Sequence, residues 1–266
     1  LVRKDKNGKY ICDIVLIMIN NPPVNVLTVD VAKGIMNIFN EMDSNDKCKG
    51  YIITTKEHKR KNGKPNIFGA GFDISVFAQN DISKTDEYFT QVSGIFDALI
   101  NTPKPIICAM NGNAIAGGVI QALYCDYRIM QKGYYVALNE SRISVNLSDA
   151  TFNLVKRAVG STHKAKYVLQ TGKNFHAKEA LQIGLIDKIS KSTNQNEFIN
   201  ECIDILANDY LKSDLNIVKN IKKMANNEIS NVIKTDGDSR KKRNEAFTAP
   251  NVVAFAKRIT KRNQAK

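Results

Sequence analysis

The chain has 266 residues, and its 43% hydrophobic share is normal for a globular protein, which excludes wholesale disorder. Its 39 Lys and Arg outnumber its 26 Asp and Glu, so the formal net charge is +13 at pH 7. Two explanations for this charge stay open, a polyanionic partner and a general bias in composition. No apolar run approaches the roughly 18 residues of a membrane helix, so we expect no membrane span.

The cysteine and histidine patterns indicate neither a disulfide framework nor a metal site. The five cysteines are widely spaced, they form no CxxC pair, and the three histidines share no metal-ligand spacing. We therefore expect free thiols in a reducing compartment and no bound metal. The sequence begins at Leu1 rather than Met, which is compatible with the removal of a targeting segment.

The first half of the sequence predicts strands that alternate with helices. Short apolar runs bounded by turn residues predict strands at 13–19, 51–55, 105–110, 127–130 and 134–138. Amphipathic spacing predicts one helix that begins at Asp30 as N-cap, a second that runs from Ser83 or Thr85 to Leu99, and a third over 119–125. Alternation at this spacing predicts an α/β core.

The pattern after residue 149 is mostly helical. Helical stripes cover 149–159, 162–170, 177–184, 196–212, 213–227 and 250–263. We therefore predict a core over residues 1–190 and a helical C-terminal region over 191–266, with an approximate boundary in the polar stretch 190–196.

Two glycine-containing segments are the strongest candidates for a ligand site. FGAGFDI (68–74) follows a strand and a polar loop, and NGNAIAGG (111–118) follows a strand and opens a helix. Small residues let a ligand approach backbone N–H groups closely, and the second segment adds the positive end of a helix. Two such donors that converge on one carbonyl oxygen would form an oxyanion hole.

These segments belong to a set of five motifs in a fixed order. The other three are NPPVNVL (21–27), CDYRIM (125–130) and AKEALQIGLID (177–187). Through this set, over about residues 13–263, the chain resembles the enoyl-CoA hydratase/isomerase (crotonase) superfamily. The resemblance implies a crotonase-like α/β spiral of ββα turns with a helical C-terminal trimerisation region.

The resemblance also implies a substrate and an assembly. The substrate would be an acyl-CoA thioester, CoA would be part of that substrate, and no separate cofactor would be needed. The oxyanion hole would consist of the backbone N–H groups of Phe72 and Gly117. The chain would form homotrimers or dimers of trimers, with no nucleic-acid partner. Residues implied in acyl-CoA binding are Val24, Val26, Ala70, Gly71, Asp73, Ile74, Gly118 and Asn139.

The candidate base is a single glutamate. Hydratases of this family hold a water between two glutamates, and the first of those positions is Ile120 here, whereas the second is Glu140. A lone carboxylate in an apolar pocket favours a proton shuttle over hydration, because burial raises its pKa and the oxyanion hole stabilises the enolate. NPPVN near the start, the aliphatic residue at 120, CDYRI and the LNE triplet that ends at Glu140 also resemble the mitochondrial Δ3,Δ2-enoyl-CoA isomerases. This resemblance implies that Glu140 moves a proton from C2 to C4, in fatty-acid β-oxidation.

Other reactions stay open at this point. Dienoyl-CoA isomerases carry a second acid eight residues after the corresponding glutamate, and Asp149 lies nine residues after Glu140, where it also suits a helix N-cap. A hydratase, a decarboxylase or another enolate-forming enzyme would use the same oxyanion hole. Asp73 is expected to cap its turn, and Asn139 and Ser141 to position the base.

Two basic regions bear on the net charge. Family lysines that contact CoA phosphates are replaced by Asn66 and Ser75, so Lys64 or the run at 59–61 would have to substitute for them. The C-terminal segment is also basic, and a non-catalytic RNA-binding homologue is the alternative there. Its aromatics Phe247 and Phe255 are placed like helix-face contacts rather than stacking platforms. We expect an intracellular protein, in the mitochondrial matrix or peroxisome if eukaryotic and in the cytoplasm if bacterial.

Overall fold

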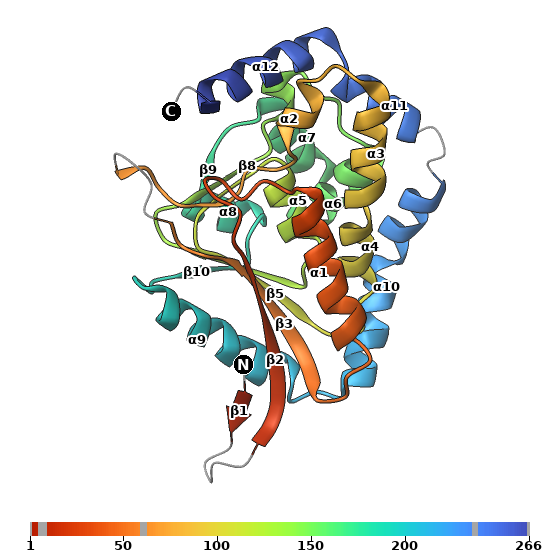
Figure 1. Cartoon of the computed structure of the whole chain (residues 1–266). Coiled ribbons are helices and arrows are strands. Elements are labelled where there is room, and N and C mark those ends of the chain that lie inside the picture. The colour runs from red at the N-terminus through yellow and green to blue at the C-terminus, as the bar shows by residue number, and fades with distance from the viewer. Residues whose placement is uncertain (1, 5–9, 59–62, 236–238, 265–266) are drawn as a thin grey trace.

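Strands and helices alternate through the first half of the chain, as the sequence predicts, and they build two sheets with helices packed around them (Figure 1). The computed structural model describes residues 2–4, 10–58, 63–235 and 239–264.

The larger sheet has six strands in the order β1-β2-β3-β5-β7-β10. β1 pairs antiparallel with β2, and every other neighbouring pair is parallel. The strands are β1 (Val2–Lys4), β2 (Tyr10–Ile19), β3 (Cys48–Thr55), β5 (Ile106–Met110), β7 (Tyr127–Gln131) and β10 (Lys188–Ser190). β3 and β5 are buried along nearly their whole length, as expected for parallel strands covered on both faces.

The smaller sheet has four short strands in the order β4-β6-β8-β9. β4, β6 and β8 are parallel, and β9 pairs antiparallel with β8. They are β4 (Ile67–Gly69), β6 (Asn113–Ile115), β8 (Tyr135–Ala137) and β9 (Phe175–His176). Only β8 has a predicted counterpart among these, because it lies within the longer run 134–138. Segments as short as β4, β6 and β9 leave no measurable alternation in a sequence.

Helices pack on both faces of the larger sheet and against one another. In the first part of the chain these are α1 (Val29–Met42), α2 (Ile74–Phe77), α3 (Ile82–Val92), α4 (Gly94–Asn101) and α5 (Gly117–Leu123). The later ones are α6 (Asp149–Val159), α7 (Thr162–Thr171), α8 (Ala177–Ile183), α9 (Gln195–Ile205), α10 (Leu215–Thr235), α11 (Ser239–Phe247) and α12 (Pro250–Gln264).

Side-chain alternation along the central strands separates two cores. Ile52 and Ile107 pack with Phe198 and Cys202 of α9 on one face. The alternate residues, such as Ile53 of β3, face the larger core, which the remaining helices share. Figure 1 shows α9 lying across the strands on the side away from α1 and α4. The sheet is therefore covered on both faces, and its strand ends remain to carry a site.

The predicted N-cap of the first helix and the predicted extent of the second helix are wrong, whereas the start of the second lies next to the predicted Ser83. The first helix is capped by Thr28, whose hydroxyl accepts from the Val31 N–H at 3.3 Å, and Asp30 lies in its first turn. The second begins at Ile82 with Asp81 as its cap. It also divides into α3 and α4 at Ser93 and Gly94, because serine and glycine are weak helix formers.

The residues after 190 form α9 to α12 and pack on the preceding part of the chain. The predicted boundary falls between β10 and α9, and α10 contacts α4 and α6. Helix α11 has no predicted counterpart, since its charged sequence lacks an apolar stripe. Phe247 at its end packs against Phe77, with ring centroids 4.5 Å apart, as its helix-face placement predicts.

Two predictions from composition are confirmed for the part of the chain that the structure describes. Cys48, Cys108, Cys125 and Cys202 are free thiols and are buried. Among the described residues, no helix is both long enough and apolar enough to cross a bilayer.

Candidate active site

The parallel register of the small sheet brings the three predicted key residues to one edge. Gly69 of β4 pairs with Ala114 of β6, and Ile115 pairs with Ala137 of β8. Each strand then ends. Phe72 follows the end of β4 by three residues, Gly117 follows β6 by two, and Glu140 follows β8 by three. Parallel strands end at the same edge of a sheet, so these residues, far apart in sequence, gather there.

The two predicted oxyanion donors face each other across a very close backbone approach. A methyl group placed on Gly117 would lie 3.0 Å from Gly71 Cα and 3.5 Å from Phe72 N. Gly71 has φ +89°, a conformation that favours glycine. Within the described residues, neither the Phe72 nor the Gly117 N–H donates to a protein acceptor. Two unused donors side by side are the arrangement that a carbonyl oxygen needs.

The residue before Gly117 has an unusual backbone conformation. Ala116 has φ 50° and ψ −122°, which is sparsely populated for a residue with a Cβ. Its N–H donates to Ala137 O at 2.8 Å, which ties the turn to β8. Because ψ of Ala116 sets the direction of the next peptide, this strained turn aims the Gly117 N–H.

Glu140 is held buried and without a side-chain partner. It is 5% exposed, and among the described residues no donor reaches its Oε2. It opens a short 3₁₀ turn, η2 (Glu140–Ile143), which is held at Glu140 O by the Val145 N–H (3.0 Å) and through Arg142, whose Nε donates to Thr171 O (2.8 Å). Burial raises the pKa of the Glu140 carboxyl from its ordinary 4.5 to about 7, and no charged neighbour contributes to this shift.

The loop that contains Val24 and Val26, which is predicted to bind acyl-CoA, packs on β4 and the residues that lead from it to Phe72. The Ala70 N–H donates to Val24 O at 3.1 Å, and Asn25 Nδ2 donates to Ile67 O at 2.8 Å. Val24 and Val26 are half-buried. The two loops thus form one wall beside the strand ends.

Asn139 and Gly118 also lie at this edge. Asn139 directly precedes the base and is half-buried, and its Oδ1 lacks a partner among the described residues. Gly118 permits the contact between α5 and β4, because a methyl group there would lie 2.4 Å from Gly69 O. Ile120, on the same buried helix, is 7% exposed. An aliphatic side chain therefore occupies the position where the resemblance places the first of the two hydratase glutamates.

Two other acidic residues, Asp73 and Asp149, lie at the starts of helices. Asp73 caps α2, and its Oδ1 accepts from the N–H (3.0 Å) and the hydroxyl (2.7 Å) of Ser75, as expected. Ile74 is the first residue of that helix. Asp149 is exposed in the first turn of α6. The helix is capped by Ser148, so an N-cap role for Asp149 is wrong by one residue.

Asn66 and Ser75, which stand where the resemblance leads us to expect lysines, make hydrogen bonds within the fold. Asn66 is buried, and its Nδ2 donates to Asn111 O at 3.0 Å. The Ser75 hydroxyl donates its hydrogen bond to Asp73 Oδ1. Lys64 is exposed in the loop before β4, whereas the basic run at 59–61 lies outside the described residues.

Tyr88 joins the site without having been predicted there. The sequence places it only on the apolar face of a helix. In the structure its hydroxyl accepts from the Asp73 N–H at 2.9 Å and donates to Leu27 O at 2.5 Å. The one available signal is chemical, because a buried phenol must find hydrogen-bond partners that a phenylalanine would not need.

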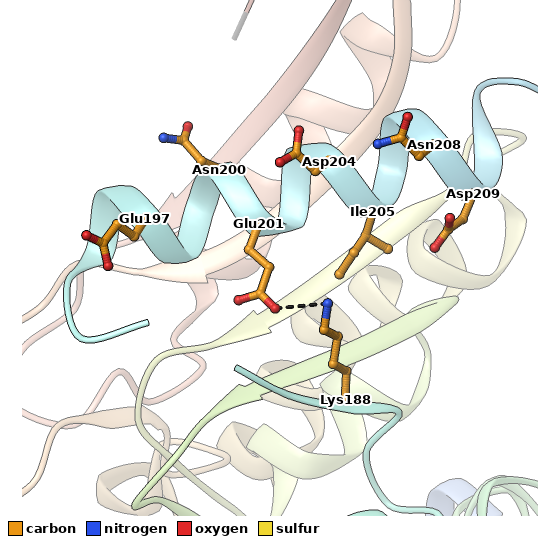
Figure 2. Close-up of a pocket in the computed structure, with 8 residues that line it drawn as sticks. All are labelled: Lys188, Glu197, Asn200, Glu201, Asp204, Ile205, Asn208 and Asp209. Atoms are coloured by element: carbon orange, nitrogen blue, oxygen red, sulfur yellow. Dashed lines mark ion pairs between the residues drawn. The ribbon is translucent and has the colours of Figure 1, made fainter. Parts of the chain in front are cut away.

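A separate surface hollow lies along α9 and involves none of the predicted site residues. Its volume is about 540 Å³. Figure 2 shows the ion pair of Lys188 with Glu201 at its base, which joins Nζ to Oε1 at 2.9 Å. The lining residues are Lys188, Glu197, Asn200, Glu201, Asp204, Ile205, Asn208 and Asp209. It is a polar surface feature on the far side of the larger sheet from the core helices.

Comparison with curated proteins gives relatives at moderate identity. The sequence model of the enoyl-CoA hydratase/isomerase family matches residues 11–254. The chain is 31% identical over 189 residues to the mitochondrial enoyl-CoA delta isomerase 1 of Rattus norvegicus, covering 70% of this chain and 61% of that protein. The Homo sapiens protein of the same name is 26% identical over 178 residues, with coverages of 66% and 56%. The match therefore spans only about 60% of these relatives' length.

Solved structures share the fold along nearly the whole chain. The crystal structure of human mitochondrial delta3-delta2-enoyl-CoA isomerase superposes with a TM-score of 0.82 at 20% identity, covering 95% of this chain and 94% of that one. Pseudomonas aeruginosa DspI superposes with a TM-score of 0.70 at 26% identity, with coverages of 86% and 89%. The predicted crotonase-like α/β fold is thereby confirmed.

Proposed function

Because this chain belongs to the enoyl-CoA hydratase/isomerase family, we propose that it is a Δ3,Δ2-enoyl-CoA isomerase of fatty-acid β-oxidation. Glu140 is its catalytic base, and the Phe72 and Gly117 N–H groups form its oxyanion hole. The substrate class is a 3-enoyl-CoA thioester. The name of the mitochondrial relatives supports this reaction, and the residues at the strand ends supply the chemistry.

The proposed reaction moves one proton within the substrate. The ionised Glu140 carboxylate removes a proton from C2, and the electron pair of that C–H bond passes to the thioester oxygen as an enolate. The two N–H donors stabilise the charge that develops on this oxygen. The enolate then collapses, its γ-carbon, C4, takes the proton from the Glu140 carboxylic acid, and the double bond lies between C2 and C3. This proton transfer needs no oxidant, reductant or added cofactor.

The observation that carries the proposal is a single buried carboxylate, whose Oε2 has no hydrogen-bond partner among the described residues, at the edge where the two free N–H groups lie. A water nucleophile needs a second polar group to hold and orient it, and Ile120 offers none. A carboxyl group whose pKa is near 7 both accepts and returns a proton at physiological pH, which a shuttle requires.

The dienoyl-CoA isomerase alternative is less well supported. It needs a second acid that faces the acyl chain, and Asp149 is exposed at the start of α6. No observation favours a decarboxylase or a non-catalytic RNA-binding protein over the isomerase.

The same proposal covers recognition, assembly and location. We propose that Lys64, which is exposed in the loop before β4, contacts the CoA phosphates, because a flexible ammonium group needs only proximity to an anion. We also propose a homotrimer or a dimer of trimers, which an exposed apolar stripe on α10 supports. The mitochondrial names of the relatives favour the mitochondrial matrix.

A coupled assay with two substrates tests the reaction. We expect turnover of 3-enoyl-CoA to 2-trans-enoyl-CoA, little hydration of 2-enoyl-CoA, and a loss in kcat of about 10²–10⁴-fold in Glu140→Gln, the usual contribution of a positioned base. The matched control is Glu41→Gln, which alters an exposed glutamate on α1 and should leave kcat unchanged. Clear hydration without isomerisation, or near-normal rates in Glu140→Gln, would contradict the proposal.

A further inference from the structure

The tyrosine hydroxyl of α3 is inserted into the backbone pairing that supports the oxyanion hole. Leu27 and Phe72 form an isolated parallel bridge, in which the Leu27 N–H donates to Gly71 O at 2.8 Å. On the other side of Phe72, the Asp73 N–H donates to the Tyr88 hydroxyl at 2.9 Å, and that hydroxyl donates to Leu27 O at 2.5 Å. Tyr88 therefore connects three segments through one atom.

This pairing determines where the Phe72 N–H points. In a parallel bridge the flanking residues bond to the partner strand, and the central residue directs its own N–H and C=O to the opposite side. For Phe72 that opposite side is the side of Gly117, whose added methyl group would lie 3.5 Å from Phe72 N. The bond from the Leu27 N–H to Gly71 O fixes the Gly71–Phe72 peptide, which carries this donor. The bond from the Asp73 N–H to the Tyr88 hydroxyl fixes the next peptide, Phe72–Asp73.

Packing between aromatic rings also holds Phe72 in place. The Phe72 ring meets Tyr88 edge-on, with centroids 6.3 Å apart, and also meets Phe89 (5.1 Å) and Phe247 (5.9 Å) edge-on. Tyr88 itself is 4% exposed. A phenylalanine would fill this packing equally well, so the hydroxyl must be explained by its hydrogen bonds.

We propose that Tyr88 is a positioning residue for the oxyanion hole: its hydroxyl holds the Asp73 and Leu27 backbone so that the Phe72 N–H meets the thioester oxygen. This inference rests on the proposed function, since it takes the Phe72 N–H as a donor to an acyl-CoA carbonyl. Tyr88 itself touches no reacting atom.

Tyr88→Phe is the test, because it keeps the ring and removes only the hydroxyl. We expect kcat for 3-enoyl-CoA to fall about 10- to 100-fold, the scale of a misplaced donor, with KM within about threefold. A second readout is the infrared carbonyl frequency of a bound ¹³C=O-labelled acyl-CoA. Its shift to lower wavenumber on binding reports oxyanion-hole polarisation and should shrink in the variant.

The chain provides a matched control in a second buried tyrosine. The Tyr51 hydroxyl donates to Asp43 Oδ1 at 2.6 Å, and Tyr51 lies in the larger sheet. Tyr51→Phe should lower Tm but leave kcat and the carbonyl shift unchanged. If Tyr88→Phe does not fold, 4-aminophenylalanine at position 88 keeps the donor to Leu27 O but accepts only weakly from the Asp73 N–H, so it should fold with a partial loss of kcat and of the carbonyl shift.

The outcomes separate this inference from the proposed function. Wild-type kcat and carbonyl shift in a folded Tyr88→Phe would overturn the positioning role while leaving the isomerase intact. A wild type that polarises the carbonyl but isomerises nothing would overturn the isomerase, and the loss of polarisation in Tyr88→Phe would still support the role of Tyr88. A wild type that does not shift the carbonyl frequency would overturn both.

Discussion

At the scale of single residues, the environment of Glu140 matters more than its identity. Burial of its carboxylate, whose Oε2 has no partner among the described residues, disfavours the charged form, so the neutral acid persists to higher pH than it would in water. In the proposed mechanism the charged form is the base, so the burial that raises the pKa of Glu140 to about 7 should also limit the fraction of active enzyme below that pH.

The pH dependence of catalysis follows from this pKa. We expect kcat/KM for 3-enoyl-CoA to rise about tenfold per pH unit up to about pH 7 and to level off above it, because only the ionised base reacts. Steady-state rates measured from pH 5 to 9 check this. A profile that is already flat above pH 5 would show that Glu140 is not the titrating base.

The free energy of unfolding should fall as pH rises from about 4.5 to about 7, whereas kcat/KM rises. The folded protein holds the Glu140 proton up to about pH 7, whereas the unfolded chain releases it near 4.5, so the folded state loses stability as pH rises between these values. The difference amounts to about 3 kcal/mol for a shift of this size. Glu140→Gln lacks this ionisation. As a control, its Tm should exceed that of the wild type more at pH 8 than at pH 5.

At the scale of elements, the site depends on how closely α5 approaches β4. Gly69 and Gly118 meet backbone to backbone, and Gly71 meets the adjacent Gly117 in the same way. The strand register delivers the two loops to one edge, and the missing side chains let them touch. A glycine here is required by space, whereas at Gly34 of α1 nothing lies within 4 Å of an added methyl group.

Gly118→Ala should disturb both the fold and the reaction. Its methyl group would meet Gly69 O, a backbone atom that can move only if the β4 to β6 pairing shifts. We expect a destabilisation of about 1–3 kcal/mol, typical of overpacking, together with a lower kcat. Denaturant unfolding and the isomerase assay measure the two effects.

The control for this prediction is Gly34→Ala. That position lies within a helix with open space around it, so alanine should stabilise the protein by about 0.5–1 kcal/mol and leave kcat unchanged. Equal stability of Gly118→Ala and wild type, with full activity, would contradict the role given to the close approach.

At the scale of the whole molecule, α10 separates a docked face from an exposed one. Its inner face is held by Lys222, whose Nζ contacts Asp126 Oδ2 at 2.7 Å, and by Asn226, whose Nδ2 donates to Ile100 O at 2.9 Å. Its outer face carries Ile217, Ile221 and Met224, which are 55%, 60% and 77% exposed. Their spacing of four and three residues places them on one stripe.

The proposed trimer predicts that this stripe is covered in the assembly. The wild type should have a solution mass of three or six times the chain's 29.7 kDa, and Ile221→Lys should shift it toward the single chain by placing a charge in an apolar contact. Light scattering coupled to gel filtration measures both masses. Lys223→Glu, an exposed change elsewhere on α10, is the control; a monomeric wild type would refute the assembly.

The sequence alone determined much of this protein. Apolar runs predicted the long strands, glycines marked the two loops, and the motif order gave the family, Phe72, Gly117 and Glu140. These features are local patterns, which a chain carries whether or not it is folded. Composition likewise predicted free thiols, and all four cysteines with described side chains are free.

Only the tertiary structure decided what brings these residues together. The short strands β4 and β6 leave no periodic signal, yet their register with β8 places the two loops and the base at one edge. Asp149 gained its exposed position, and Tyr88 its place between Leu27 and Asp73, from packing between segments distant in sequence. Burial and hydrogen-bond partners are properties of the folded chain, so a sequence can name candidate catalytic residues, whereas their pKa values and orientations arise only on folding.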